Sequence, residues 1–176
     1  MQDTVNPNGI QWGIRVAHVD DAWDYTTGDT SVIIAVVDHG INWGPPDFAQ
    51  GTRTTPTYWT NSGEDAWSDP LVPGGNGIDD DQNGYVDDWL GWNFAENDEI
   101  ISDSWTFPHG TGVACVALAR THNLEGMAGV AGGWANAAGA RGMAVKIVDS
   151  AGNNQNAALY AAQAIEYAAH KTVRRL

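Results

Sequence analysis

The sequence predicts an α/β fold organised around a parallel sheet. Residues 32–37 are all apolar and run directly into Asp38, which is typical of a strand buried on both faces in the middle of such a sheet. A second run over residues 143–148, apolar except for Lys146, ends in the same way at Asp149. The order strand, long loop, helix, strand, helix favours parallel strands joined by right-handed crossovers.

The first strand is expected over residues 31–38, and a short helix precedes it. Within residues 1–30, Val16, Val19, Ala22 and Trp23 recur at helical spacing, and Gly28 then marks the end of the helix.

The second half of the chain predicts two further helices around the second strand. Residues 109–120 open with His109 and continue as small apolar residues, which indicates a buried helix. Residues 126–140 form a loop rich in glycine and alanine, and the strand follows over residues 143–149. Helical spacing over residues 156–169 predicts the last helix, which Asn153, Asn154 or Asn156 could cap.

Composition excludes several classes of protein. The chain has 176 residues and a net charge of −14, which argues against binding to nucleic acid or anionic membranes, because phosphate binding requires clustered Lys and Arg. No apolar run is long enough to span a membrane. Since no charged segment followed by an apolar run precedes the first strand, we expect no signal peptide in this chain. Cys115 is the single cysteine, so no intrachain disulfide can form. This composition suits a secreted protein, a calcium-binding protein, or both.

Residues 52–105 are predicted to form a long loop region that needs an ordering element. Pro45, Pro46, Gly51 and Pro56 interrupt regular structure around its start, and the region holds many Asp, Asn, Gly and Trp residues. A structureless connection of this length is unusual in a compact domain. We therefore expect a bound ion to order it.

Residues 79–88 (DDDQNGYVDD) have the composition of a calcium-binding loop. Hard oxygen ligands alternate along it, and Gly84 allows a sharp turn. Leu90 stands where an EF-hand has its final Glu, so the loop is not an EF-hand. The candidate ligands are Asp79, Asp81, Asn83, the carbonyl of Tyr85, and Asp87 directly or through water. The alternative is a solvated acidic turn.

Asp38 and His109 are the candidate catalytic residues. Asp38 lies at the carboxyl end of a strand, where ligands and chemistry collect in α/β sheets, and His109 opens a helix beside small residues that leave its ring accessible. A turn aspartate and a structural histidine are the alternatives. His122 fits no metal-ligand spacing.

A catalytic aspartate and histidine are expected to activate a nucleophilic side chain, and the sequence offers no recognisable one. None of its serines lies in a G-x-S-x-G motif or follows a glycine-rich turn into a helix. Cys115 would point away from His109 on a helix. The serines are Ser31, Ser62, Ser68, Ser102, Ser104 and Ser150.

Together these stretches resemble the subtilisin-like serine proteases, the subtilases. Residues 38–41 (DHGI) followed by residues 46–48 (PDF) are similar to the aspartate motif of the family, and residues 109–114 (HGTGVA) are similar to its histidine motif. Residues 76–94 resemble a calcium-loop segment of one branch. The family's first helix is similar to residues 11–14 and 22–23 of this chain. The family segment that leads into the last predicted helix is similar to residues 128–131 and 143–149.

The resemblance implies a three-layer, parallel-sheet subtilisin-like fold, of which residues 1–176 form a partial peptidase domain, its first half. It implies that His109 is the general base and acid and that Asp38 orients and supports it, as in the Asp–His–Ser triad. It further implies a polypeptide substrate, a structural calcium ion and an extracellular location.

The chain departs from the family pattern at four motif positions. His39 replaces a small hydroxyl residue, Pro45 and Gly112 each replace a histidine, and Cys115 replaces a glycine. The resemblance also stops before the oxyanion asparagine and the nucleophilic serine of the family. We therefore expect the chain to be inactive alone, and the sequence leaves open whether a complementing chain supplies the serine.

Three functional hypotheses follow. The first is the subtilase-derived endopeptidase half. The second is a calcium-ordered acidic module that binds or scaffolds other molecules, with Asp38 and His109 vestigial. The third is a hydrolase that uses His109 with a metal, for which the sequence shows no ligand set.

Overall fold

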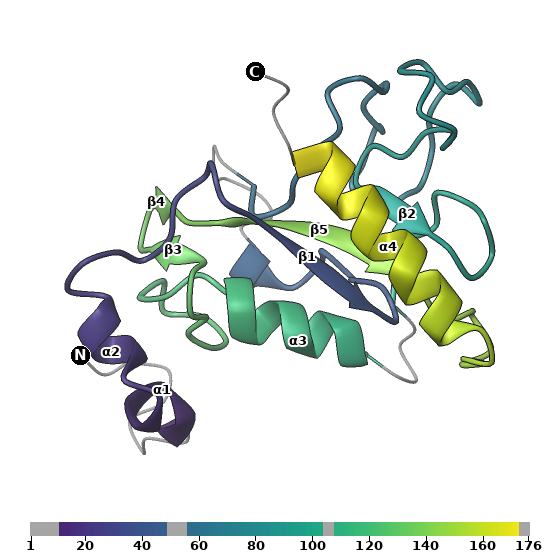
Figure 1. The fold of residues 1–176 in the computed structure, drawn as a ribbon. Helices are drawn as coiled ribbons and strands as arrows, with labels where there is room; N and C mark the ends of the chain where they lie inside the picture. The colour runs from purple at the N-terminus through teal and green to yellow at the C-terminus, as the bar shows by residue number, and fades with distance from the viewer. Residues whose placement is uncertain (1–10, 49–55, 104–107, 173–176) are drawn as a thin grey trace. The chain divides into compact units, whose positions relative to one another are not determined.

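The computed structural model describes residues 11–48, 56–103 and 108–172 (Figure 1). The chain divides into two compact units. The first consists of residues 1–34, 44–57 and 112–142, and the second of residues 35–43, 58–111 and 143–176.

In the first unit, the single short helix predicted near the start is two helices. α1 covers Trp12–Val16 and α2 covers Val19–Ala22. His18 between them has a left-handed backbone with φ 55°, which cannot continue a right-handed helix. The expectation of one helix was therefore wrong, because side-chain spacing does not reveal this break.

Most of α3, His109–Leu118, belongs to the first unit and confirms the helix predicted over residues 109–120. The helix is not fully buried as expected, because Val113 and Val116 are exposed. The predicted glycine- and alanine-rich loop contains a small antiparallel hairpin of β3, Gly133–Trp134, and β4, Ala137–Ala138. A 3₁₀ turn over Pro46–Phe48 buries Asp47. The Asp47 carboxylate accepts hydrogen bonds from the Asn123 side chain at 3.0 Å and the Met127 amide at 2.9 Å.

Most of the three-stranded sheet belongs to the second unit, and its order is β1-β5-β2. The predicted α/β architecture with a parallel sheet is confirmed. β1 covers Ile33–Asp38 and β5 covers Arg141–Lys146, close to the two predicted strands. The amides of Arg141 and Ile147 donate to the carbonyls of Val32 and Asp38, and this constant offset defines a parallel pair.

The strand predicted for the middle of the sheet lies at an edge of the sheet that the structure describes. β1 is mostly half-buried, whereas β5 is buried from Gly142 onward and pairs on both sides. The expectation that β1 is buried on both faces was therefore wrong for this part of the chain. An all-apolar run shows that a strand is apolar on both faces, but it does not show which strands flank it.

The third strand, β2, covers Gly91–Asn93 and lies inside the region predicted as one long loop. It pairs in parallel with β5, with Gly91 opposite Ala144. Gly91 has φ +135°, and a Cβ atom there would lie 1.8 Å from the Ala144 carbonyl oxygen. Only glycine fits this close approach of two backbones.

α4, Ala157–Thr172, confirms the helix predicted over residues 156–169 and lies beside β2 (Figure 1). Its Tyr167 ring packs edge-on against Tyr85 and Phe94, with centroids 5.0 and 5.9 Å away. This aromatic group joins the helix to the end of β2 and to the acidic loop, residues 79–88. Among the described residues, no helix has the length and apolar character needed to span a membrane.

Candidate functional site

The structure brings Asp38 and His109 into direct contact. Asp38 is the last residue of β1, and His109 is the first residue of α3. The His109 Nδ1 atom lies 2.8 Å from Oδ1 and 3.0 Å from Oδ2 of Asp38. The Asp38 side chain is 15% exposed and the His109 side chain 66% exposed. The Nδ1 edge of a largely solvent-accessible imidazole is therefore held by a mostly buried carboxylate.

Glycines allow two close approaches around this contact, one between Gly40 and Ile101 and one between Gly110 at the start of α3 and the end of β1. Gly40 has φ +106°, and a Cβ atom there would lie 2.4 Å from the carbonyl oxygen of Ile101. A Cβ atom on Gly110 would lie 2.1 Å from the Gly40 carbonyl oxygen and 3.1 Å from the Asp38 Cβ atom. The glycines that follow the aspartate and the histidine are thus steric requirements of the contact.

Thr111 fixes the first turn of α3 to the loop that follows β1. Its backbone amide donates to Asp103 Oδ2 at 2.9 Å, and its hydroxyl oxygen accepts from the Asn42 amide at 2.9 Å. The Asp103 carboxylate therefore satisfies one of the amides that a helix leaves unpaired at its start. Together these bonds hold the His109 backbone in place.

Hydrogen bonding decides the protonation of both partners. Partial burial alone would raise the pKa of Asp38, but hydrogen bonds from the His39 amide and from the His109 and His39 rings outweigh it and lower that pKa. The hydrogen bond to Asp38 and then its negative charge raise the pKa of His109. The carboxylate thus favours the imidazolium form and makes His109 a stronger base.

His39, noted in the sequence only as a departure from the family pattern, also contacts Asp38. Its backbone amide donates to Asp38 Oδ1 at 2.7 Å, and its ring Nδ1 atom lies 2.9 Å from the same oxygen. The His39 and His109 ring centroids are 5.6 Å apart. Asp38 is therefore shared by two imidazoles.

The structure supports neither Ser150 nor Cys115 as a nucleophile. The Ser150 hydroxyl donates to Glu96 at 2.6 Å, and this bond is the main reason that the pKa of Glu96 falls to about 2. Burial raises the pKa of the Cys115 thiol to about 11, so the reactive thiolate is disfavoured. Of the serines in the described ranges, none donates a hydrogen bond to the His109 ring.

A cavity of about 650 Å³ lies beside His39 in the second unit. Apolar and aromatic side chains such as Trp43, Trp67 and Leu71 line part of it, and Glu96 and Ser150 contribute polar atoms. Its size and mixed lining are typical of sites that take a side chain or a small ligand.

A second group of candidate functional residues is the acidic region, which consists of Glu64 and the carboxylates of residues 79–88. Ligand atoms of Glu64, Asp79 and Asp81 lie within 4.8 Å of one another, so these three side chains could hold a metal ion. Glu64 is buried and lies fifteen positions before Asp79. Sequence reasoning missed it because no spacing rule links it to the loop.

The remaining predicted ligands have other contacts. The Asp87 carboxylate accepts hydrogen bonds from the backbone amides of Asn76 and Gly77, at 3.0 and 2.9 Å, and Asp87 lies outside the group of three. Asn83 donates from its side chain to Asp88 at 3.2 Å. Tyr85 places its ring against Tyr167, a contact that does not involve the carbonyl oxygen predicted as the ligand.

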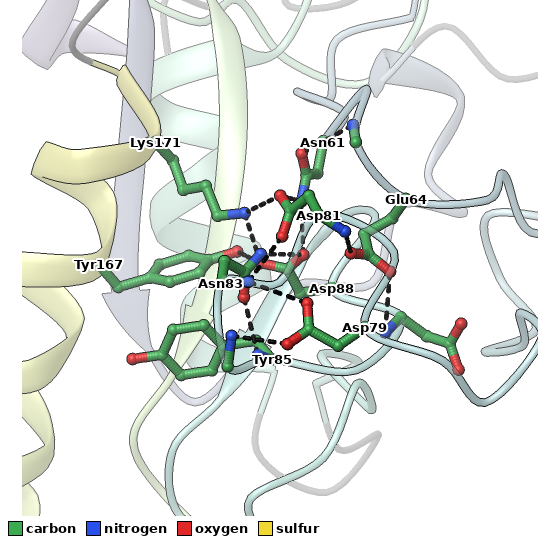
Figure 2. Close-up of polar contacts among 12 residues, drawn as sticks. Asn61, Glu64, Asp79, Asp81, Asn83, Tyr85, Asp88, Tyr167 and Lys171 are labelled. Atoms are coloured by element: carbon green, nitrogen blue, oxygen red, sulfur yellow. Dashed lines mark hydrogen bonds and ion pairs between the residues drawn. The ribbon is translucent and has the colours of Figure 1, made fainter.

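A lysine from α4 reaches into the acidic region, as Figure 2 shows. Lys171 Nζ lies 2.9 Å from Asp81 and 3.2 Å from Asp88. Burial raises the pKa values of Asp88 and Glu64, whereas Asp81, despite its own desolvation, is held to a pKa of about 2 by Lys171, Asn61 and Asn83. The single ammonium thus offsets only part of the negative charge.

Comparison with known proteins gives consistent matches. The profile of the subtilase family matches residues 29–174. The chain is 32% identical over 124 residues to subtilisin-like protease 1 of Plasmodium berghei (strain Anka), covering 69% of this chain and 18% of that protein. It is 31% identical over 122 residues to halolysin of Haloferax mediterranei, covering 69% and 17%.

A thermophilic serine proteinase from Bacillus sp. (strain AK1) is 29% identical over 123 residues, covering 70% of this chain and 21% of that proteinase. In each case the chain spans about a fifth of the relative's length.

The two nearby glycines of α3 give a matched stability test. Gly110→Ala should destabilise the protein by at least about 2 kcal/mol, because its Cβ atom would collide with the Gly40 carbonyl. Gly112→Ala meets nothing within 4 Å and should stabilise the helix by about 0.5–1 kcal/mol. Urea unfolding of both variants measures the difference, and equal effects would contradict the close approach.

The charge of Asp38 should control the titration of His109. In EDTA-treated buffer, ¹H–¹³C NMR should give a His109 pKa above 6.5, and Asp38→Asn should lower it. The stability that the pair contributes is present below the unfolded-state pKa of about 6.5 and is lost as the pH rises through the folded-state pKa. Asp20→Asn, on α2, is the control. A His109 titration unaffected by Asp38→Asn would show that the contact does not form in solution.

Proposed function

The chain belongs to the subtilase family, and on that premise we propose that it supplies the aspartate and histidine of a serine endopeptidase that hydrolyses polypeptides. The observation that carries the proposal is the contact between the Asp38 carboxylate and the Nδ1 atom of His109. Of the three relatives named above, one is called a protease, one a proteinase and one halolysin. Membership of the same family supports a polypeptide substrate.

In this proposal His109 transfers protons and Asp38 positions it. The hydrogen bond at Nδ1 leaves the Nε2 atom free to take the proton of a serine hydroxyl as that hydroxyl attacks the peptide carbonyl. His109 then returns the proton to the leaving amine. Asp38 fixes the tautomer and stabilises the imidazolium that forms. None of the described serines donates a hydrogen bond to the His109 ring, and Ser104 lies outside the described residues. In this proposal the nucleophilic serine therefore comes from other polypeptide.

We further propose that the acidic region holds a structural calcium ion. The donor set of Glu64, Asp79 and Asp81 fits the ion, because calcium prefers carboxylate oxygens. Burial raises the pKa of Glu64, which indicates that its negative charge is poorly compensated, and a bound cation would relieve this. The ion would order the loop and would take no part in the reaction.

A chimera tests the proposed activity. These 176 residues would be joined to the part of halolysin that follows the aligned segment. We expect a fluorophosphonate to label the chimera and the chimera to cleave peptide anilides, whereas the 176-residue chain alone is not labelled. His109→Ala should reduce turnover by about 10⁴ or more, and His122→Ala should not. Activity that survives His109→Ala would contradict the proposal, because His109 would then not be the base, and a folded chimera without activity would favour the non-catalytic module.

Calcium should raise the melting temperature of the chain, because it binds the folded loop. At a hundredfold excess over Kd the gain is about 2.7 kcal/mol, which is roughly 5–10 °C for a chain of this size. Glu64→Gln should reduce the shift between calcium and EGTA, whereas Asp87→Asn should lower the melting temperature in both buffers and keep the shift. If Asp87→Asn reduced the shift between calcium and EGTA and Glu64→Gln kept it, Asp87 and not Glu64 would be the ligand.

A further inference from the structure

The second imidazole beside Asp38 creates a group of side chains that the proposed catalysis does not require. Ligand atoms of Asp38, His39 and His109 all lie within 4.8 Å of one another. The Nδ1 atoms of the two histidines lie 2.9 and 2.8 Å from the same oxygen, Asp38 Oδ1. Among the described residues this is the one group of three potential metal ligands that contains nitrogen.

Two imidazoles and one carboxylate are a suitable ligand set for zinc. Zn²⁺ binds histidine nitrogen and carboxylate oxygen at about 2.0–2.2 Å, and catalytic-type sites use three protein ligands with water as the fourth. Ligand atoms around a tetrahedral ion lie about 3.3 Å apart at those bond lengths. The observed separations of 2.8 and 2.9 Å would need to open by a few tenths of an ångström, which side-chain rotation can provide.

Access and surroundings also favour a metal ion here. The side chains of His39 and His109 are 35% and 66% exposed, so an ion and its water can reach the ring nitrogens. The backbone amide of His39 donates to Asp38 Oδ1 and orients the carboxylate between the rings. Calcium and magnesium prefer oxygen ligands, so the two nitrogens select zinc or a similar transition metal.

We propose that Asp38, His39 and His109 together bind one Zn²⁺ ion. The site is separate from the acidic group of Glu64, Asp79 and Asp81, which has no nitrogen ligand. When zinc binds, it takes the place of the proton on the Nδ1 atom of each ring. His109 is then a metal ligand and is no longer available as the base that the proposed function needs. The binding of zinc does not depend on the proposed function. Inhibition by zinc does rest on it.

The binding test uses the 176-residue chain and Zn²⁺ alone. Isothermal titration in calcium-containing buffer should give one zinc ion per chain. His39→Ser, which introduces the small hydroxyl residue typical of the family, and His109→Ala should each weaken zinc binding at least tenfold. His18→Ala is the matched control, because His18 also lies beside a carboxylate, 2.9 Å from Asp21, but has no second imidazole there. Unchanged affinity in His39→Ser would overturn the proposal.

A second measurement needs no variant and covers the case in which a substituted chain fails to fold. NMR of the wild-type rings should show the His39 and His109 signals shifting together at one equivalent of Zn²⁺. If the signals of His18, His122 or His170 shift instead, the site is elsewhere and the proposal is wrong.

The regulatory consequence is tested in the active chimera. Zn²⁺ should inhibit peptide cleavage, a chelator should restore it, and His39→Ser should raise the inhibiting concentration at least tenfold. Zinc binding in a chimera that cleaves peptides at an unchanged rate would overturn the inhibition. A chimera with no activity at all would count against the proposed function and would leave the titration and NMR results to decide the zinc site.

Discussion

The Asp38 carboxylate is the constraint on which the candidate site depends. Its Oδ1 atom faces the His39 amide and two imidazoles, so a mostly buried negative charge is compensated by hydrogen bonds rather than by a fixed cation. Burial of a carboxylate is costly unless it is paired in this way. The two glycines that allow the backbones to meet, Gly40 and Gly110, and the tie between Thr111 and Asp103 all serve to keep that charge satisfied.

Much of the fold could be predicted because its main elements carry strong periodic signals. The apolar runs gave β1 and β5, and the small-residue and helical patterns gave α3 and α4 within a few residues. β2 was missed because three residues, one of them Gly91, show no periodicity, and only pairing with β5 makes them a strand. The left-handed residue His18 and the edge position of β1 depend on backbone geometry and neighbours that a local pattern does not contain.

The candidate site was predictable where short motifs fix the spacing and was missed where residues meet only in three dimensions. Asp38 and His109 were identified through their motifs, although 71 positions separate them. Glu64 and Lys171 lie far along the chain from the acidic loop and are brought to it by the fold. Asp87 follows the alternating pattern and stays a predicted ligand; its carboxylate accepts bonds from the amides of Asn76 and Gly77, which the pattern does not reveal. His39 had a visible signal, an imidazole next to the aspartate, whose meaning depended on the ring geometry.

The ammonium group of Lys171 lies between Asp81 and Asp88 and acts as a covalently tethered counter-ion. A tethered charge has a fixed local concentration, so this part of the charge balance does not vary with the ions dissolved around the protein. A diffusible cation at the neighbouring carboxylates would vary in that way. With the proposed ion bound, the loop would combine a permanent contribution to its order from Lys171 with one that responds to the surroundings, and losing the second need not abolish the first.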